Sequence, residues 1–159
     1  MSEQLFLQRR HLLIASGAGA VTAVTGNPAA ARAAQQATGN ITQPDTPGDA
    51  AFVERAFEMR KLAVEKGDQA YGAVIVRDGV IIGQSWSRVI LGQDPTGHAE
   101  IAAIRDAAHR TSSHDLAGAL MYYSSRPCPM CEAAAFWAGI GQMIHGRNAT
   151  SAGAPGLCR

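Results

Sequence analysis

Apolar side chains recur at helical spacing between Asp49 and Lys66, and charged side chains occupy most of the positions between them. This pattern predicts an amphipathic helix that the following Gly-Asp pair ends. Its inward-facing residues are predicted to be Phe52, Val53, Ala56, Phe57, Met59, Leu62 and Ala63. Two β-rich runs follow, at 71–76 and 80–86, with an Asp-Gly pair between them. That pair is a strong hairpin signal, so the two runs are predicted to pair as antiparallel strands.

The rest of the chain alternates between helical and extended patterns. A turn at 94–97 precedes a helix predicted from His98 to Arg110, and a strand over 119–124, a helix over 129–138 and a short strand over 142–145 follow. The helix from His98 is expected to turn inward Ile101, Ala102, Ile104 and Ala108. Alternating elements predict an α/β protein, a sheet covered by helices. The chain has 159 residues, enough for one domain with a hydrophobic core.

The N-terminal region has a separate character. It contains Arg9 and Arg10, then an apolar stretch over 12–24, then a small-x-small site around Arg32, an order that resembles a twin-arginine export signal. We interpret 1–33 as a signal peptide that exports the protein to the periplasm or beyond; the alternative is a cytoplasmic protein with an accidental Arg-Arg pair. The apolar stretch is shorter than the ~20 residues of a membrane helix, so no stable span is expected. Residues 34–48 are predicted to be a flexible linker, and 49–159 the functional domain.

The charge balance bears on the partner. Of 14 basic and 13 acidic side chains, residues 1–33 contain three and one, which leaves 11 and 12 in the rest. Proteins that bind folded RNA depend on basic side chains to neutralise phosphates. A nucleic-acid partner is therefore disfavoured, and a small-molecule substrate is favoured.

Two motifs, each at the start of a predicted helix, contain the candidate chemistry. His-Ala-Glu begins at His98, and Pro-Cys-Pro-Met-Cys contains Cys128 and Cys131. Cysteines three apart lie side by side on a first helical turn, where the helix dipole favours thiolate. One imidazole and two thiolates leave the fourth position of a catalytic zinc open, and water bound there needs a proton carrier. We predict one Zn²⁺ per chain, held by His98, Cys128 and Cys131, with Glu100 as the catalytic acid and base.

These motifs resemble the signature of zinc base deaminases, His-x-Glu followed by Pro-Cys-x-x-Cys, in which the Glu is not a metal ligand. The likeness runs from about Phe52 to Gly146 and includes 71–76 and 94–96, as in the guanine deaminase and tRNA adenosine deaminase branch of the cytidine deaminase superfamily. It implies a three-layer α/β/α fold and a homodimer. It also implies hydrolytic deamination, in which zinc-bound hydroxide attacks the amino-bearing ring carbon and ammonia leaves. Pro-Cys-Pro-Met-Cys and Phe-Trp-Ala at 136–138 favour a guanine deaminase-like enzyme acting on a free base or nucleoside. A tRNA adenosine deaminase is the alternative.

The chain departs from this family in three places. Arg126 stands where the family usually has Glu, and Ser87 where relatives of this branch have a substrate-contacting Asn, eleven residues before His98. The chain also stops soon after the last predicted strand, so the family's final helix and strand are expected to be reduced or missing. These departures leave open a zinc-binding member with impaired catalysis. Ser87, Ala99 and Tyr71 are the expected substrate contacts.

A Cys-Pro-x-Cys motif also occurs in thiol–disulfide oxidoreductases. In the thioredoxin fold, however, the motif comes early and several strands and helices follow it, whereas only 28 residues follow Cys131 here. A redox function also gives His98 and Glu100 no role. The metal hypothesis is therefore preferred.

Overall fold

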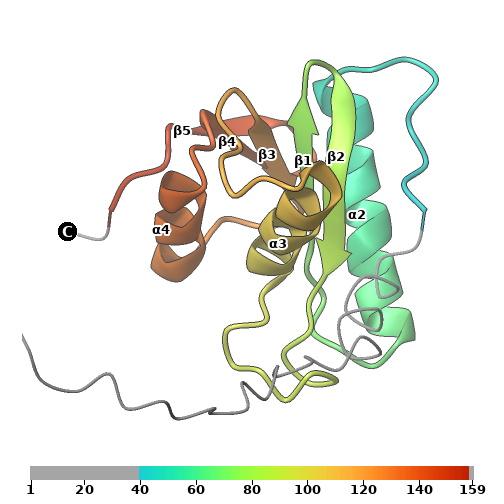
Figure 1. The fold of residues 1–159 in the computed structure, drawn as a ribbon. Helices are drawn as coiled ribbons and strands as arrows, with labels where there is room; N and C mark the ends of the chain where they lie inside the picture. The colour runs from blue at the N-terminus through green and yellow to red at the C-terminus, as the bar shows by residue number, and fades with distance from the viewer. Residues whose placement is uncertain (1–39, 158–159) are drawn as a thin grey trace, which may run out of the picture.

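The computed structural model describes residues 40–157, which form a five-stranded sheet with helices on both faces (Figure 1). The predicted signal peptide and residues 34–39 of the predicted linker lie outside the described residues. Within 40–157, no helix combines the length and the apolar character that crossing a bilayer requires.

The elements follow the predicted order, with one addition at the end. They are α2 (Asp49–Glu65), β1 (Gly72–Arg77), β2 (Val80–Trp86), α3 (Ala99–Thr111), β3 (Leu120–Tyr123), α4 (Pro129–Trp137), β4 (Gln142–His145) and β5 (Thr150–Gly153). The predicted hairpin is confirmed. Asp78 and Gly79 both have positive φ, 53° and 75°, as a two-residue turn with the twist of a hairpin requires.

The strand order is β2-β1-β3-β4-β5. β1 is antiparallel to both β2 and β3, β3 and β4 are parallel, and β5 returns antiparallel to β4. A parallel neighbour needs a crossover, and α4 provides it between β3 and β4. α3 and α4 therefore cover the same face of the sheet.

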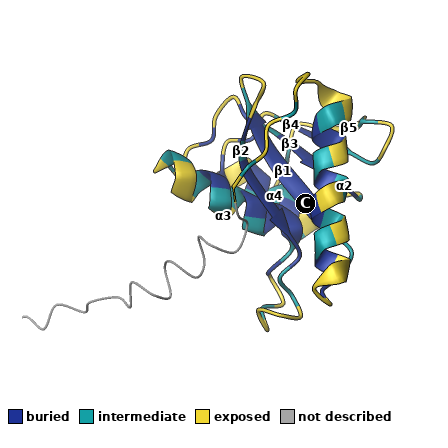
Figure 2. Ribbon diagram, turned by 90° about the vertical axis from the view of Figure 1, so that its right-hand side faces the viewer, coloured by how far each residue is buried: buried dark blue, intermediate teal, exposed yellow. Residues whose placement is uncertain are grey.

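The core consists of two layers, one on each face of the sheet. Alternate residues of the central strands point to opposite faces, as the pleat dictates. Val74, Val76, Tyr122 and Ile144 pack against α2, whereas Ala73, Ile75, Met121 and Met143 pack beneath α3 and α4. Figure 2 shows the buried strands in the middle and the exposed outer side of α2. The predicted three-layer α/β/α architecture is confirmed.

The inward face of α3 differs from the prediction. Ala103 and Ala107 are fully buried, while Ala102, Ile104 and Ala108 are only partly buried. α3 lies so close to β2 that a Cβ atom added to Gly83 would be 2.6 Å from the Cβ of Ala107. Only small side chains fit this gap, so Ala103 and Ala107 face the sheet. Ile101 is buried as predicted, and Ile104 packs against the core although it is only partly buried.

Both ends of the folded part also differ from expectation. Gln43, predicted to lie in a flexible linker, pairs its side-chain amide with both backbone groups of Ile81, at 2.8 and 2.9 Å, and Ile41 packs on the core. The folded unit therefore begins before Asp49. At the other end, β5 supplies a final strand, although its four residues are all exposed. Within 40–157, no helix follows α4.

Candidate metal centre and active site

The two chemical motifs lie at the N-termini of α3 and α4. His98 and Cys128 are the N-cap residues of these helices, and both have extended backbones. Pro129 occupies the first turn of α4, where its missing N–H leaves no bond unmade. Because an N-cap residue precedes the helix, the side chain of His98 is not bound to helical spacing. It can therefore converge with Glu100, two residues later.

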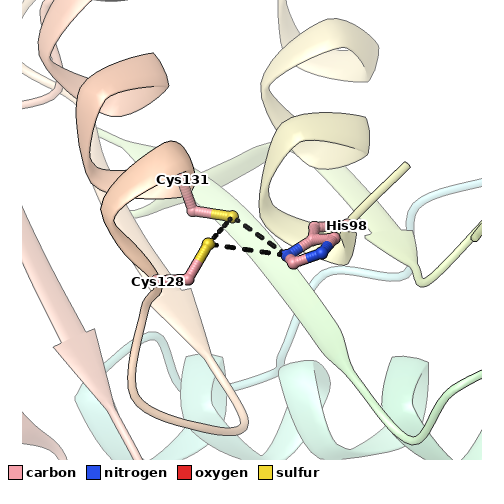
Figure 3. A group of neighbouring side chains, drawn as sticks. All are labelled: His98, Cys128 and Cys131. Atoms are coloured by element: carbon pink, nitrogen blue, oxygen red, sulfur yellow. Dashed lines mark hydrogen bonds between the residues drawn. The ribbon is translucent and has the colours of Figure 1, made fainter. Parts of the chain in front are cut away.

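The three predicted ligands meet, as Figure 3 shows. Nδ1 of His98 lies 3.7 Å from Sγ of Cys128 and 3.6 Å from Sγ of Cys131, and the two sulfurs are 3.5 Å apart. A tetrahedral zinc with ordinary bond lengths places two sulfurs about 3.8 Å apart and a sulfur about 3.6 Å from a nitrogen. The observed edges are those of one face of such a tetrahedron. The donor set therefore fits zinc, with a fourth position left for water or substrate.

Glu100 lies beside this triangle and is only 6% exposed. Burial raises the pKa of Glu100, and hydrogen bonds from its own backbone N–H and from the Cys131 side chain, together with the charge of His98, offset part of that effect. A carboxyl with a raised pKa holds a proton more readily near neutral pH, which suits a proton carrier.

The environment of Cys131 shows what a metal would change. Burial raises the pKa of this thiol, and the nearby charge of Glu100 and the contacts with Cys128 add to the effect. A bound dication acts in the opposite direction, because coordination requires the thiolate and displaces its proton. The thiolate of Cys131 is therefore destabilised by burial when it is alone and stabilised when it coordinates a metal.

The three expected substrate contacts lie in different surroundings. Ser87 is fully buried and hydrogen bonds to Asp68, and its backbone N–H donates to the carbonyl of Tyr71 at 3.1 Å. Ala99 is fully buried in the core beneath α3, so its side chain packs there. Tyr71 is 44% exposed at the start of β1. Contact with substrate stays a prediction for all three residues.

Asp68 has a structural role that the sequence did not reveal. Its buried carboxylate accepts hydrogen bonds from the backbone N–H groups of Gln69, Ile90 and Leu91, at 2.7, 3.1 and 2.9 Å. The loop of residues 87–97, which leads into His98, is therefore fastened to the end of α2. In the sequence Asp68 looks like an ordinary helix terminator, and no local pattern indicates the distant loop as its partner.

Arg126 is exposed and lies outside the ligand triangle. It lines a cavity of about 380 Å³ together with Pro127, Pro129, Glu132, Met143 and Ala152. The departure from the family pattern at this position therefore changes a neighbouring surface and leaves the metal ligands intact.

A His-Cys-Cys donor set with an open position and a buried carboxylate beside it defines a catalytic zinc site of the hydrolytic type. Comparison with known proteins adds the family. Residues 47–147 match the family described as the cytidine and deoxycytidylate deaminase zinc-binding region, and the chain belongs to this family.

Relatives with known activities are deaminases of two kinds. Guanine deaminase from Bacillus subtilis is 37% identical over 107 residues, which cover 67% of this chain and 69% of the relative. The tRNA-specific adenosine deaminase from Aquifex aeolicus is 38% identical over 93 residues, 58% of this chain and 62% of the relative. The chain thus spans about two thirds of the length of these relatives.

The solved structures that are similar to this chain include the same two kinds of deaminase. The structure of the Bacillus subtilis guanine deaminase is 38% identical with a TM-score of 0.58, and covers 60% of this chain and 61% of its own. A structure from a study of tRNA:A34 deaminases is 39% identical with a TM-score of 0.58, and covers 60% and 69%. The cytidine deaminase-like fold is confirmed, and the two kinds of relative are similar to this chain to the same degree.

Proposed function

We propose that this protein catalyses the zinc-dependent hydrolytic deamination of guanine or of a related free base or nucleoside. One observation carries the deaminase assignment: His98, Cys128 and Cys131 converge from two helix starts, with the buried Glu100 beside them. His98, Cys128 and Cys131 would hold the metal. When bound, zinc supplies a nucleophile at neutral pH by lowering the pKa of water.

The chain's own contribution to the reaction is proton transfer by Glu100. Water forms a bond to the ring carbon, the bond from that carbon to the exocyclic amino group breaks, and ammonia leaves. Glu100 accepts the first proton of the attacking water and passes it to the ring nitrogen. It then carries the second proton, from the new hydroxyl group, to the departing amine, which leaves a carbonyl on the ring carbon. Its burial beside Cys131 keeps bulk water from competing for that proton.

The charge distribution supports a small substrate. Residues 40–157 contain 10 basic and 12 acidic side chains. Five of those basic side chains are paired with carboxylates, namely Arg55, Lys61, Arg105, Arg110 and Arg147. A surface that binds a folded RNA needs free positive charge, which this arrangement reduces. The similarity to a guanine deaminase makes guanine the first small molecule to test.

Deamination of adenosine in tRNA is the second candidate. It is favoured by the 38% identity to the Aquifex aeolicus tRNA-specific enzyme and by the 39% identity to the structure from the tRNA:A34 deaminase study.

We also propose a homodimer. The exposed aromatic pair at the end of α4, with Trp137 at 74% exposure and Phe136 at 42%, supports a subunit contact there.

Ammonia release from a panel of substrates tests the proposal. The panel contains guanine, guanosine, cytosine, adenosine and a tRNA anticodon stem-loop, each with zinc-loaded protein. We expect release from guanine or guanosine and none from the RNA. Release from the stem-loop alone would establish the second candidate and refute the first.

Glu100→Ala tests the assignment of the proton carrier. Loss of a general acid and base lowers turnover by roughly 10²- to 10⁴-fold, while the zinc content stays at about one per chain because Glu100 is not a ligand. Glu65→Ala, an exposed carboxylate at the end of α2, is the matched control and should keep wild-type turnover. Turnover that survives in Glu100→Ala would remove Glu100 from the mechanism.

A further inference from the structure

Tyr123, the last residue of β3, lies within the core layer beneath α3 and α4 and is only 1% exposed. Its ring stacks on His145 of the neighbouring strand, with centroids 5.9 Å apart and planes inclined by 21°. The stacking and the packed core fix the direction of the ring. The position of the hydroxyl is therefore set by the fold.

The hydroxyl of Tyr123 has no hydrogen-bond partner among residues 40–157. Nearly all buried hydroxyls in proteins form a hydrogen bond. A buried donor without an acceptor has lost its hydrogen bonds to water and gains none in the protein, which destabilises the fold. The adjacent Tyr122 provides the contrast. Its hydroxyl, on the other face of the sheet, donates to Oδ1 of Asp49 at 2.7 Å. We therefore expect the unpaired hydroxyl of Tyr123 to have an acceptor nearby in the functional state of the protein.

Tyr123 packs in one core cluster with Ala99, the residue directly before Glu100 at the start of α3. The candidate acceptors at the helix starts are Glu100, and Cys131 and Glu132 in the first turn of α4. Burial raises the pKa of Tyr123, and the charges of Glu100, Glu132 and Cys131 raise it further, in that order. The charge of Arg126 acts in the opposite direction, but the pKa stays raised, so the hydroxyl is a protonated donor at neutral pH.

Glu100 is the best of these acceptors. Glu132 is only partly buried and lines the same cavity as Arg126, so its carboxylate can be hydrated, and the sulfur of Cys131 faces His98 and Cys128. Glu100 is a buried carboxylate, and its two oxygens accept up to about four hydrogen bonds.

We infer that Tyr123 is a positioning residue of the metal centre, whose hydroxyl donates a hydrogen bond to the carboxylate of Glu100 when zinc occupies the site. In the structure a hydrogen bond joins Glu100 to the Cys131 side chain. A cysteine that coordinates a metal no longer has a proton to donate, so Glu100 needs another donor in the loaded centre. Tyr123 supplies it and holds the carboxylate toward the reacting atoms. The inference rests on the proposed metal site and is independent of which substrate is deaminated.

Tyr123→Phe removes only the hydroxyl, and Tyr122→Phe is its matched control. Melting temperatures are compared for the zinc-loaded and metal-free forms of each variant. We expect Tyr123→Phe to lower the melting temperature of the loaded form and to leave the metal-free form unchanged or more stable. Tyr122→Phe should lower both forms equally, because its bond to Asp49 does not depend on the metal. By linkage, the zinc affinity of Tyr123→Phe should fall roughly tenfold, measured by competition with a chromophoric chelator.

The same comparison in a Glu100→Ala background identifies the acceptor. The zinc-dependent effect of Tyr123→Phe should disappear there. An equal loss in both forms of Tyr123→Phe would reduce Tyr123 to a packing residue, and an effect that persists without Glu100 would refute Glu100 as the acceptor. If the metal-free protein does not fold, the chelator competition makes the same comparison alone. None of these measurements uses a substrate, so inactivity toward guanine would count only against the proposed function.

Discussion

Gly83 offers a test of how the fold builds the metal centre. It lies on β2 at the point where α3 approaches the sheet. A Cβ atom added there would be 2.6 Å from both the Cβ and the backbone nitrogen of Ala107, and 2.7 Å from its Cα. Two of these three atoms belong to the backbone, so no side-chain rotation can relieve the clash. In Gly83→Ala, α3 must move away from the sheet.

The size of that movement follows from van der Waals distances. Carbon atoms pack at about 3.5 to 4.0 Å, so α3 must retreat by about 1 Å at Ala107. Overpacking of this kind costs roughly 1 to 3 kcal/mol, or about 4 to 12 °C in melting temperature for a domain of this size. α3 also sets the place of His98 at its N-terminus. Metal ligands tolerate displacements of only about 0.2 Å, so zinc affinity should fall by at least about tenfold.

The assay combines thermal unfolding with zinc competition on Gly83→Ala. Gly141→Ala is the matched control, because a Cβ there meets only the carbonyl of Ala119 at an ordinary 3.6 Å. The control should melt and bind zinc like the wild type. If the melting temperature and zinc affinity of Gly83→Ala are unchanged, α3 can accommodate the added methyl group. That result would refute the link between this close approach and the metal centre.

Three further outcomes are expected. Cys128→Ser should lose zinc and melt at a lower temperature, because binding energy at such a site is also folding energy; elemental analysis showing one zinc per chain would contradict this. Asp68→Asn should destabilise the protein at neutral pH. Burial raises the pKa of Asp68, but hydrogen bonds from Leu91, Ser87, Gln69 and Ile90 outweigh it and leave the pKa lowered. Its stabilising contribution is therefore present above about pH 3.9 and is lost as the pH falls through the lower folded-state value, so the melting curves of wild type and variant should converge in acid. For export, which we propose from the twin-arginine motif alone, replacing Arg9 and Arg10 by Lys should retain the precursor in the cytoplasm, and unchanged secretion would disprove it.

The candidate metal donors and the order of the elements could be read from local patterns in the sequence. The donors His98, Cys128 and Cys131 could be named because each motif stands at a helix start, where local capping and dipole effects act on neighbouring residues. The hairpin at Asp78 was equally local, since a two-residue turn needs residues that tolerate positive φ. Interactions within a few residues are encoded in spacing. The hairpin was confirmed, and the three donors lie close enough together to hold one ion.

The distances between the elements, and the side chains that fill the space between them, became known from the three-dimensional structure. Helical periodicity placed Ala102 and Ala108 inward, but the structure buries Ala103 and Ala107 instead, with Ala107 in close contact with Gly83. The pairing of Gln43 with Ile81 joins residues 38 apart. The groups near the buried hydroxyl of Tyr123 belong to α3, which precedes its strand, and to α4, which follows it. Such relations depend on distances between segments far apart along the chain. A sequence pattern records which side chains are apolar or charged, whereas packing decides which of them meet.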